Sequence, residues 1–256
     1  MNSNDPHILG KAPVGKLLIQ YSLPAIIAMT LTSLYNIIDS IFIGHGVGAM
    51  AISGLAITFP MMNLLIAFCT LVGVGGATIS SIRLGQHDKE GAEQILGNVT
   101  VLCIIYSLIF STVTLLYLDP ILRFFGASDV TLPYARDFME IILIGNPIAY
   151  LMLGLNNIMC ASGYPKKAML SSVLSVGCNI VLAPLFIFVF DWGIRGAAWA
   201  TTISQFLALI WVLHHFTNRN TYIRLHRRYL KLRSRIVRQI FGIGMSPFAM
   251  NVCACC

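Results

Sequence analysis

The chain has 256 residues, of which 57% are hydrophobic and only 11% charged, and this composition excludes an ordinary water-soluble domain. Most of its formal net charge of +7 lies in one short basic stretch that also carries a regular apolar pattern, which argues against nucleic-acid binding. We therefore expect an integral membrane protein.

Six apolar stretches, each long enough to cross a bilayer as a helix, follow one another along the chain. Their approximate bounds are 17–43, 51–82, 95–118, 132–161, 168–190 and 194–216. Several exceed the roughly 20 residues that a bilayer requires, and prolines 24, 60, 147 and 184 fall inside them, so we expect tilts and bends. The predicted fold is an all-α integral membrane protein with a six-helix transmembrane bundle.

The first stretch carries a single acid, Asp39, between Leu17 and Ile43. An acid near the bilayer centre costs about 2.5–3.5 kcal/mol on insertion scales, so the default hypothesis is that such an acid has a function. Tyr35 and Asn36 precede it by four and three residues, which places the three side chains on one helical face. Two interpretations remain open: a protonatable or cation-binding carboxylate facing a water-filled cavity, and an interfacial acid wetted from outside.

The second stretch contains the glycine run LVGVGGATIS, residues 71–80. It lacks the lysine of a phosphate loop and follows no strand, so we expect close helix packing rather than nucleotide binding. No HExxH motif or nucleophile elbow occurs, and we expect neither enzyme activity nor a cofactor. The cysteines within the apolar stretches have no ligand-like spacing, and the terminal Cys253, Cys255 and Cys256 have no second pair or histidine nearby, so a structural metal site is not expected.

Polar residues and methionines inside the spans are the other candidates for a site. A single intramembrane amide or hydroxyl is explained by helix–helix hydrogen bonding, whereas several on one cavity form a polar pocket. Methionines fill gaps, and they also suit a cavity that accepts varied apolar ligands. The residues concerned are Met29, Met61, Asn156, Asn157, Asn179 and Thr201.

The basic residues predict an orientation. With segment 1–16 cytoplasmic, 14 of the 17 lysines and arginines are cytoplasmic, and Arg123, Arg136 and Arg195 lie outside. This asymmetry follows the positive-inside rule. Glu140 in the fourth stretch has Arg136 as its i−4 neighbour, and we interpret this acid as a structural partner at the outer rim.

After the sixth stretch, residues 218–239 hold eight basic residues and an apolar residue every three or four positions. This pattern predicts an amphipathic basic linker helix on the anionic cytoplasmic leaflet. The following IGMSPFAMN, residues 243–251, echoes YSLPAIIAM, residues 21–29, where a second half would begin. Because the chain stops within this segment, 240–256, we expect the first half of a longer protein, with 17–217 as its first lobe.

Several motifs, taken in order, carry a resemblance to a known family. They are YNIIDSIFIGHGVGAMAISGLAITFP, SIRLGQHDKEGAEQILG, ILRFFGASDVTLPYARDFMEIILIGNP, ASGYPKKAM, NIVLAPLFIF and GIRGAAWATTISQF. From about Lys16 to its last residue the chain resembles the multidrug and toxic compound extrusion (MATE) family. The similarity is strongest to the DinF-like bacterial and archaeal branch of that family.

The resemblance implies twelve helices in two pseudo-symmetric six-helix lobes, of which this chain is the N-terminal one. It implies a monomeric transporter of a bacterial cytoplasmic membrane that exports amphipathic, often cationic molecules in exchange for protons or sodium ions. By the same resemblance, Asp39 matches the essential first-helix aspartate and Tyr35 the tyrosine near it. Pro24 matches a proline whose bending is proposed to accompany protonation, and Asn179 and Thr201 match polar partners on the fifth and sixth helices.

One position departs from the family pattern. The fifth-helix motif of this branch commonly reads Asn-x-x-x-Asp-Pro, and NIVLAP places Ala183 where the second carboxylate would be. Coupling, to a proton or to a sodium ion held at Asp39, would then rest on that residue alone.

The leading hypothesis is an ion-coupled multidrug antiporter with a cavity that includes Met29, Met61, Asn156 and Asn157. A lipid-linked oligosaccharide flippase of the same superfamily is an alternative, against which stands the lack of arginine or lysine in mid-span. An inactive or non-transporting membrane fragment is another. Reading the coding sequence beyond residue 256 separates this last alternative from a transporter.

Overall fold

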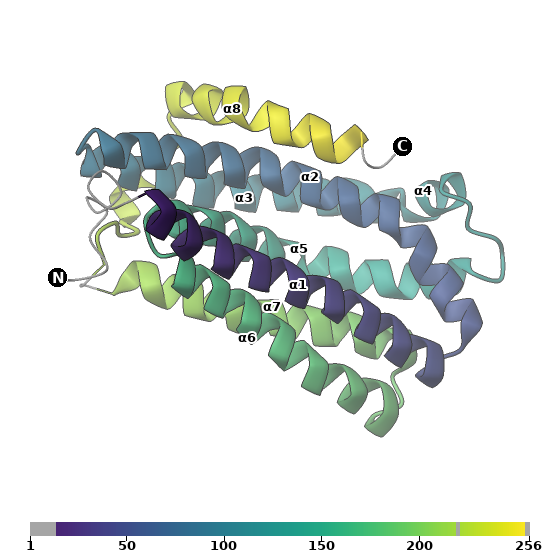
Figure 1. Cartoon of the computed structure of the whole chain (residues 1–256). Helices are drawn as coiled ribbons and strands as arrows, with labels where there is room; N and C mark the ends of the chain where they lie inside the picture. Colours follow the sequence, from purple (N-terminus) through teal and green to yellow (C-terminus); the bar gives the residue numbers. More distant parts are fainter. Residues whose placement is uncertain (1–13, 219–220, 254–256) are drawn as a thin grey trace.

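The computed structural model describes residues 14–218 and 221–253, with the side chains of a few helical positions, among them Asn36, left out. The described chain forms a bundle of long helices (Figure 1). The helices are α1 (Val14–Gly46), α2 (Ala49–Gly85), α3 (Lys89–Leu116), α4 (Leu118–Phe124), α5 (Leu132–Ala161), α6 (Pro165–Pro184), α7 (Gly193–Thr217) and α8 (Ser234–Cys253). A π-helical turn, Leu185–Val189, extends α6, and a 3₁₀ turn, Arg227–Tyr229, precedes α8.

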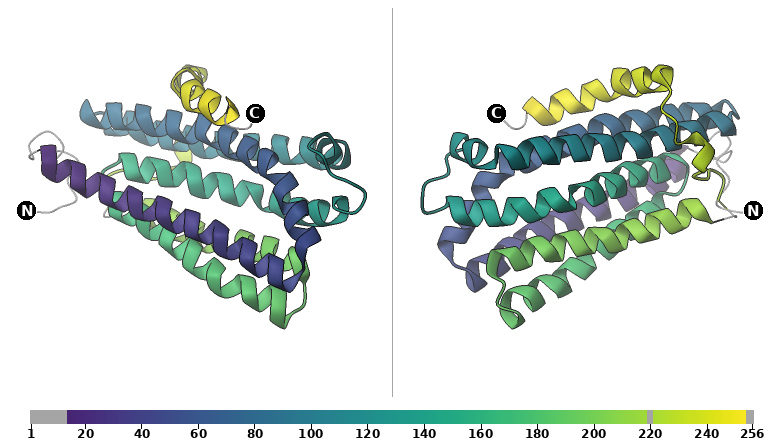
Figure 2. Two further views of the ribbon diagram at one scale, coloured as in Figure 1. Left: turned by 45° about the vertical axis from the view of Figure 1, so that its right-hand side comes forward. Right: turned by 180° about the vertical axis from the view of Figure 1, so that it is seen from behind.

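Six of the described helices are long and apolar enough to span a membrane, which confirms the six predicted spans. They are α1, α2, α3, α5, α6 with its π-helical extension, and α7. α5 packs against α2, α3, α6 and α7, and α5 and α7 are the most buried spans. α1 is the least buried, because it packs mainly against α6 and leaves its other side uncovered (Figures 1 and 2).

The start of a seventh long helix was also predicted, and α8 occupies that position. It lies along the outer side of α2, away from α6 and α7 (Figure 1). The glycine run of α2 makes this contact possible. A side chain at Gly75 would meet the backbone of α8 at Ile240 and Gly244, while one at Gly73 would meet α5 and one at Gly76 would meet α3. The run therefore packs three helices closely, as its sequence predicted.

Basic residues gather at one end of the bundle, which we call the basic end. This end holds the α2–α3 turn, the start of α6 and the described residues between α7 and α8, all on the side where α1 begins (Figure 1). At the opposite end, basic residues pair with acids. Arg136 Nε lies 2.8 Å from Glu140 Oε1, and Arg195 Nη2 lies 2.7 Å from Asp137 Oδ1. The predicted pairing of Glu140 with Arg136 is therefore confirmed.

The amphipathic helix predicted over 218–239 is wrong for residues 221–233, whereas residues 234–239 are helical as the start of α8. Residues 221–233 run across the basic end with only one 3₁₀ turn, and α8 begins at Ser234 (Figure 2, right). The reason is competition for backbone donors. Side chains of α3 accept two of the N–H groups that a helix would use, because Arg224 N lies 3.2 Å from Glu93 Oε1 and Arg233 N lies 2.8 Å from Asn98 Oδ1.

Candidate functional site

Asp39 lies on the side of α1 that faces the interior of the bundle. Its side chain is buried, with 8% of the residue's surface exposed. Its Oδ1 oxygen is fully buried and has no hydrogen-bond partner among the described residues. A buried acceptor without a partner costs free energy, and a carboxylate costs more than a neutral group. The site is therefore suited to a proton or a small cation that would satisfy this oxygen.

A hydrogen-bond network centred on Thr201 of α7 lies beside this acid. Tyr35, one helical turn before Asp39, places its hydroxyl 3.1 Å from Thr201 Oγ1, and Asn179 Nδ2 of α6 donates to the same oxygen at 3.1 Å. Thr201 Oγ1 in turn donates to the Ala197 carbonyl at 3.1 Å. A hydroxyl has one proton and two lone pairs, so the Tyr35 hydroxyl must donate and the capacity of Thr201 is filled.

The structure thus brings together three of the residues named from the sequence, from α1, α6 and α7. The backbone of Asn36 lies in α1, but its side chain is outside the described residues. Ala183 is fully buried on α6, one turn after Asn179, so no carboxylate enters the site at that position. Within the described ranges no group of three or more histidine, cysteine or acidic side chains gathers around a common point.

Pro24 is buried within α1, about four turns before Asp39. The helix continues through the proline as one element (Figure 1). Because proline has no backbone N–H, one hydrogen bond of the helix is missing at this point, and bending costs less here than elsewhere in α1.

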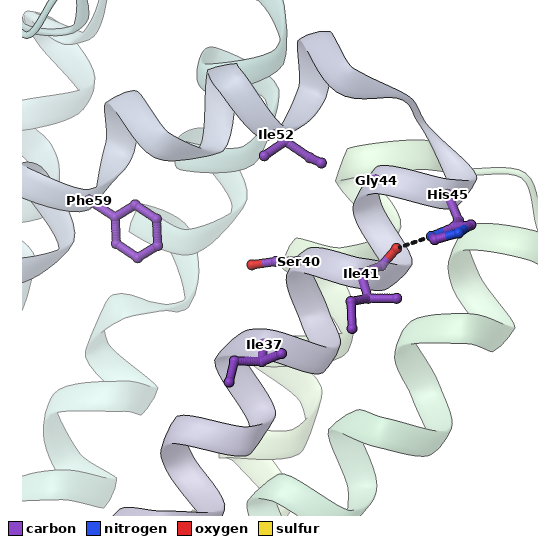
Figure 3. Close-up of a pocket in the computed structure, with 7 residues that line it drawn as sticks. All are labelled: Ile37, Ser40, Ile41, Gly44, His45, Ile52 and Phe59. Atoms are coloured by element: carbon purple, nitrogen blue, oxygen red, sulfur yellow. Dashed lines mark hydrogen bonds between the residues drawn. The ribbon is translucent and has the colours of Figure 1, made fainter.

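A groove of about 720 Å³ lies between α1 and α2 (Figure 3). At helical spacing, its α1 residues lie on the face opposite Asp39. Ile37, Ile41 and Gly44 of α1 line it, together with Ile52 and Phe59 of α2. Ser40 contributes a hydroxyl, and His45 lies at its end, with Nδ1 3.1 Å from the Ile41 carbonyl oxygen. Its volume and apolar lining suit a small amphipathic molecule.

The acid and the groove therefore share one helix but not one surface. Asp39 faces α6 and α7, whereas its neighbour Ser40 and the isoleucines before and after it face the groove. A change in the tilt or curvature of α1 alters both surfaces at once. This gives occupancy of one site a physical route to affect the other.

The residues proposed from the sequence for a substrate cavity do not meet on one surface. Met29 is 72% exposed on α1, whereas Met61 of α2 is 2% exposed in the core. Asn156 accepts a hydrogen bond of 2.8 Å from Ser171 Oγ of α6, and Asn157 lies against Gly73 of α2. Both asparagines therefore contact neighbouring helices.

The residues that line the groove were not identified from the sequence. They are mostly ordinary apolar side chains, together with Gly44, Ser40 and His45, and they form no motif. The available signal was the second stripe of α1, in which Ile37, Ile41 and Gly44 recur every three or four positions opposite Tyr35 and Asp39.

Comparison with known proteins gives one family and several relatives. The MatE family model matches residues 24–185. The chain is 31% identical over 242 residues to the multidrug export protein MepA of Staphylococcus haemolyticus, covering 94% of this chain and 54% of that protein.

Solved structures of similar proteins point to the same family. A MOP superfamily transporter from Pyrococcus furiosus is 27% identical, with a TM-score of 0.90, covering 97% of this chain and 55% of that one. An outward-facing multidrug resistance MATE family transporter is 28% identical, again with a TM-score of 0.90 and with coverages of 97% and 55%. The chain therefore spans about half the length of these relatives.

Proposed function

Because this chain belongs to the MatE family of transporters, we propose that it forms the ion-coupling lobe of a multidrug efflux antiporter. The observation that carries the proposal is the buried Asp39 oxygen without a partner, beside the hydrogen-bonded side chains of Tyr35, Thr201 and Asn179. Support also comes from MepA of Staphylococcus haemolyticus, which is named a multidrug export protein and whose similarity covers 94% of this chain.

In the proposed mechanism, a proton or a sodium ion binds at Asp39 and changes the conformation of α1. An empty, charged Asp39 favours a conformation in which its carboxylate reaches water, and an occupied one favours burial. The ion therefore binds the two conformations with unequal affinity and shifts the balance between them. Pro24 marks the point at which α1 bends most easily.

We propose the groove between α1 and α2 as part of the substrate path. Its walls are mostly apolar, which suits the hydrophobic part of an amphipathic compound. We further propose that the protein spans a bacterial cytoplasmic membrane with its basic end in the cytoplasm, because positively charged loops are retained on that side.

Dye transport tests the function. The protein made from its complete coding sequence is reconstituted into liposomes, and movement of a fluorescent cationic dye is followed while a proton or a sodium gradient is imposed. We expect only one of the two ion gradients to drive dye movement, in the direction opposite to the flow of that ion. The gradient that drives it identifies the coupling ion. Dye movement that is the same with and without either gradient would contradict the proposal.

Thr201→Val removes the acceptor of two hydrogen bonds with little change in shape. The Asn179 amide and the Tyr35 hydroxyl then lose their partner inside the bundle, at about 1–3 kcal/mol for each unsatisfied group. We expect gradient-driven dye transport to fall by roughly tenfold, since 1.4 kcal/mol already corresponds to that factor. Thr201→Ser keeps the acceptor and is the matched control. An equal loss in both variants would show that the methyl group is required as well, so that the hydrogen bonds to Thr201 alone would not explain the loss.

A further inference from the structure

A second cavity, distinct from the groove and from the Asp39 site, lies at the basic end. It has a volume of about 450 Å³ and is formed by the end of α2, the start of α3 and the start of α8. Three arginines line it: Arg83 from α2, Arg233 just before α8, and Arg235 in the first turn of α8. Two acids, Asp88 and Glu90, also belong to its wall.

Both acids are already engaged by protein groups. Asp88 caps α3 by accepting from Gly91 N at 2.8 Å, and its other oxygen lies 3.2 Å from Arg83 Nη1. Glu90 Oε1 accepts from the Gln94 side-chain amide at 3.3 Å and from the Tyr229 hydroxyl at 3.2 Å. Asp88 is therefore paired with an arginine of the wall, whereas Glu90 accepts hydrogen bonds from neutral groups. Three arginines against two acids leave the cavity with a net charge of +1 (3 − 2).

Arg233 is held in place from two sides. Its backbone N–H donates to Asn98 Oδ1 at 2.8 Å, and its Nη1 donates to Gln94 Oε1 at 2.8 Å. A guanidinium has five N–H donors, so most donors of Arg233 remain for another acceptor. The Arg235 side chain has no hydrogen-bond or ion-pair partner among residues 14–218 and 221–253.

We propose that this cavity binds a phosphate group, supplied by the headgroup of an anionic phospholipid or by a soluble phosphate. Guanidinium groups match the geometry of phosphate oxygens, and basic pockets at the cytoplasmic ends of membrane helices are suited to anionic headgroups. A phosphate bound here contacts Arg235 of α8 as well as Arg83 of α2. It therefore links α8 to the six-helix bundle at the point where the irregular segment ends.

Binding is measured on the purified 256-residue chain in a neutral detergent by native mass spectrometry. The probes are phosphatidylglycerol, phosphatidylcholine and inorganic phosphate. We expect one phosphatidylglycerol or one phosphate to bind in preference to phosphatidylcholine. Binding of phosphatidylglycerol alone identifies a lipid headgroup as the source, and equally tight binding of inorganic phosphate identifies a soluble anion. Absence of preference for either anion over phosphatidylcholine overturns the proposal.

Two variants test whether the anion binds in this cavity. Arg235→Gln is expected to weaken its binding by about threefold to tenfold, the effect of one charge-assisted hydrogen bond discounted for exposure. Gln239→Glu adds a negative charge to the same wall and is expected to weaken binding independently. The control is Arg228→Gln, which removes the same charge from an exposed residue outside the cavity wall. An equal loss in the control would mean that net charge alone attracts the anion, and would overturn the site.

Discussion

Replacing Asp39 with asparagine is expected to abolish ion-coupled dye transport while the protein still accumulates in the membrane. The two side chains have the same shape, so the packing of α1 against α6 is preserved. Asparagine cannot bind a proton at the working pH, and it has no negative charge to attract a sodium ion. Because Ala183 supplies no second carboxylate, no described acid on α6 replaces the lost function.

The same change at a distant acid is the matched control. The side chain of Asp129 is 86% exposed and pairs with Arg123 at the end of the bundle opposite the basic end. Asp129→Asn therefore removes one carboxylate without touching the bundle interior, and transport should stay close to that of the unmodified protein. Gradient-driven transport that survives in Asp39→Asn, with both variants equally abundant, would rule out Asp39 as the coupling residue.

The hydropathy of the chain was sufficient to predict the fold. Backbone groups in a bilayer must be satisfied within each segment, so long apolar stretches can only be helices, and all six proved to be long apolar helices. The glycines at 73, 75 and 76 also indicated close packing correctly. Which helix each glycine contacts did not follow from the sequence, because that depends on how the helices are arranged.

The segment after α7 shows where periodicity fails. Its apolar residues recur at helical spacing, yet Ile223 is buried in an irregular segment and Arg224 donates its N–H to α3. The acceptors, Glu93 and Asn98, are more than a hundred positions earlier in the chain. A local pattern carries no information about such distant partners, and tertiary hydrogen bonds outweighed helix formation here.

The candidate site was predictable in part. Asp39 stood out because it is the only charged residue between Leu17 and Ile43, and spacing placed Tyr35 on its face. The meeting of Asn179 and Thr201 with Tyr35 was implied only by family resemblance, since hydropathy does not distinguish a polar residue that serves a site from one that joins two helices. The groove was not predicted because its walls are mostly common apolar side chains and form only where two helices meet.

The contact between α8 and α2 gives the second large expected effect. A side chain at Gly244 would collide with the Leu71 carbonyl of α2, so Gly244→Leu must displace α8. Overpacking of this kind costs about 1–3 kcal/mol or more, whereas leucine favours helix formation over glycine. We expect the thermal unfolding midpoint in detergent to fall by about 2–10 °C, at roughly 2–4 °C per kcal/mol.

Gly242 provides the control for this experiment, because it lies on the same helix and a side chain there would meet nothing within 4 Å. Gly242→Leu changes helix propensity and hydrophobicity by the same amount as Gly244→Leu, and its expected effect on the midpoint is zero or a small increase. The difference between the two midpoints therefore isolates the helix–helix contact. Equal midpoints would mean that α8 is not held against α2 in the protein, and the cavity formed by α2, α3 and α8 would then lose one of its walls.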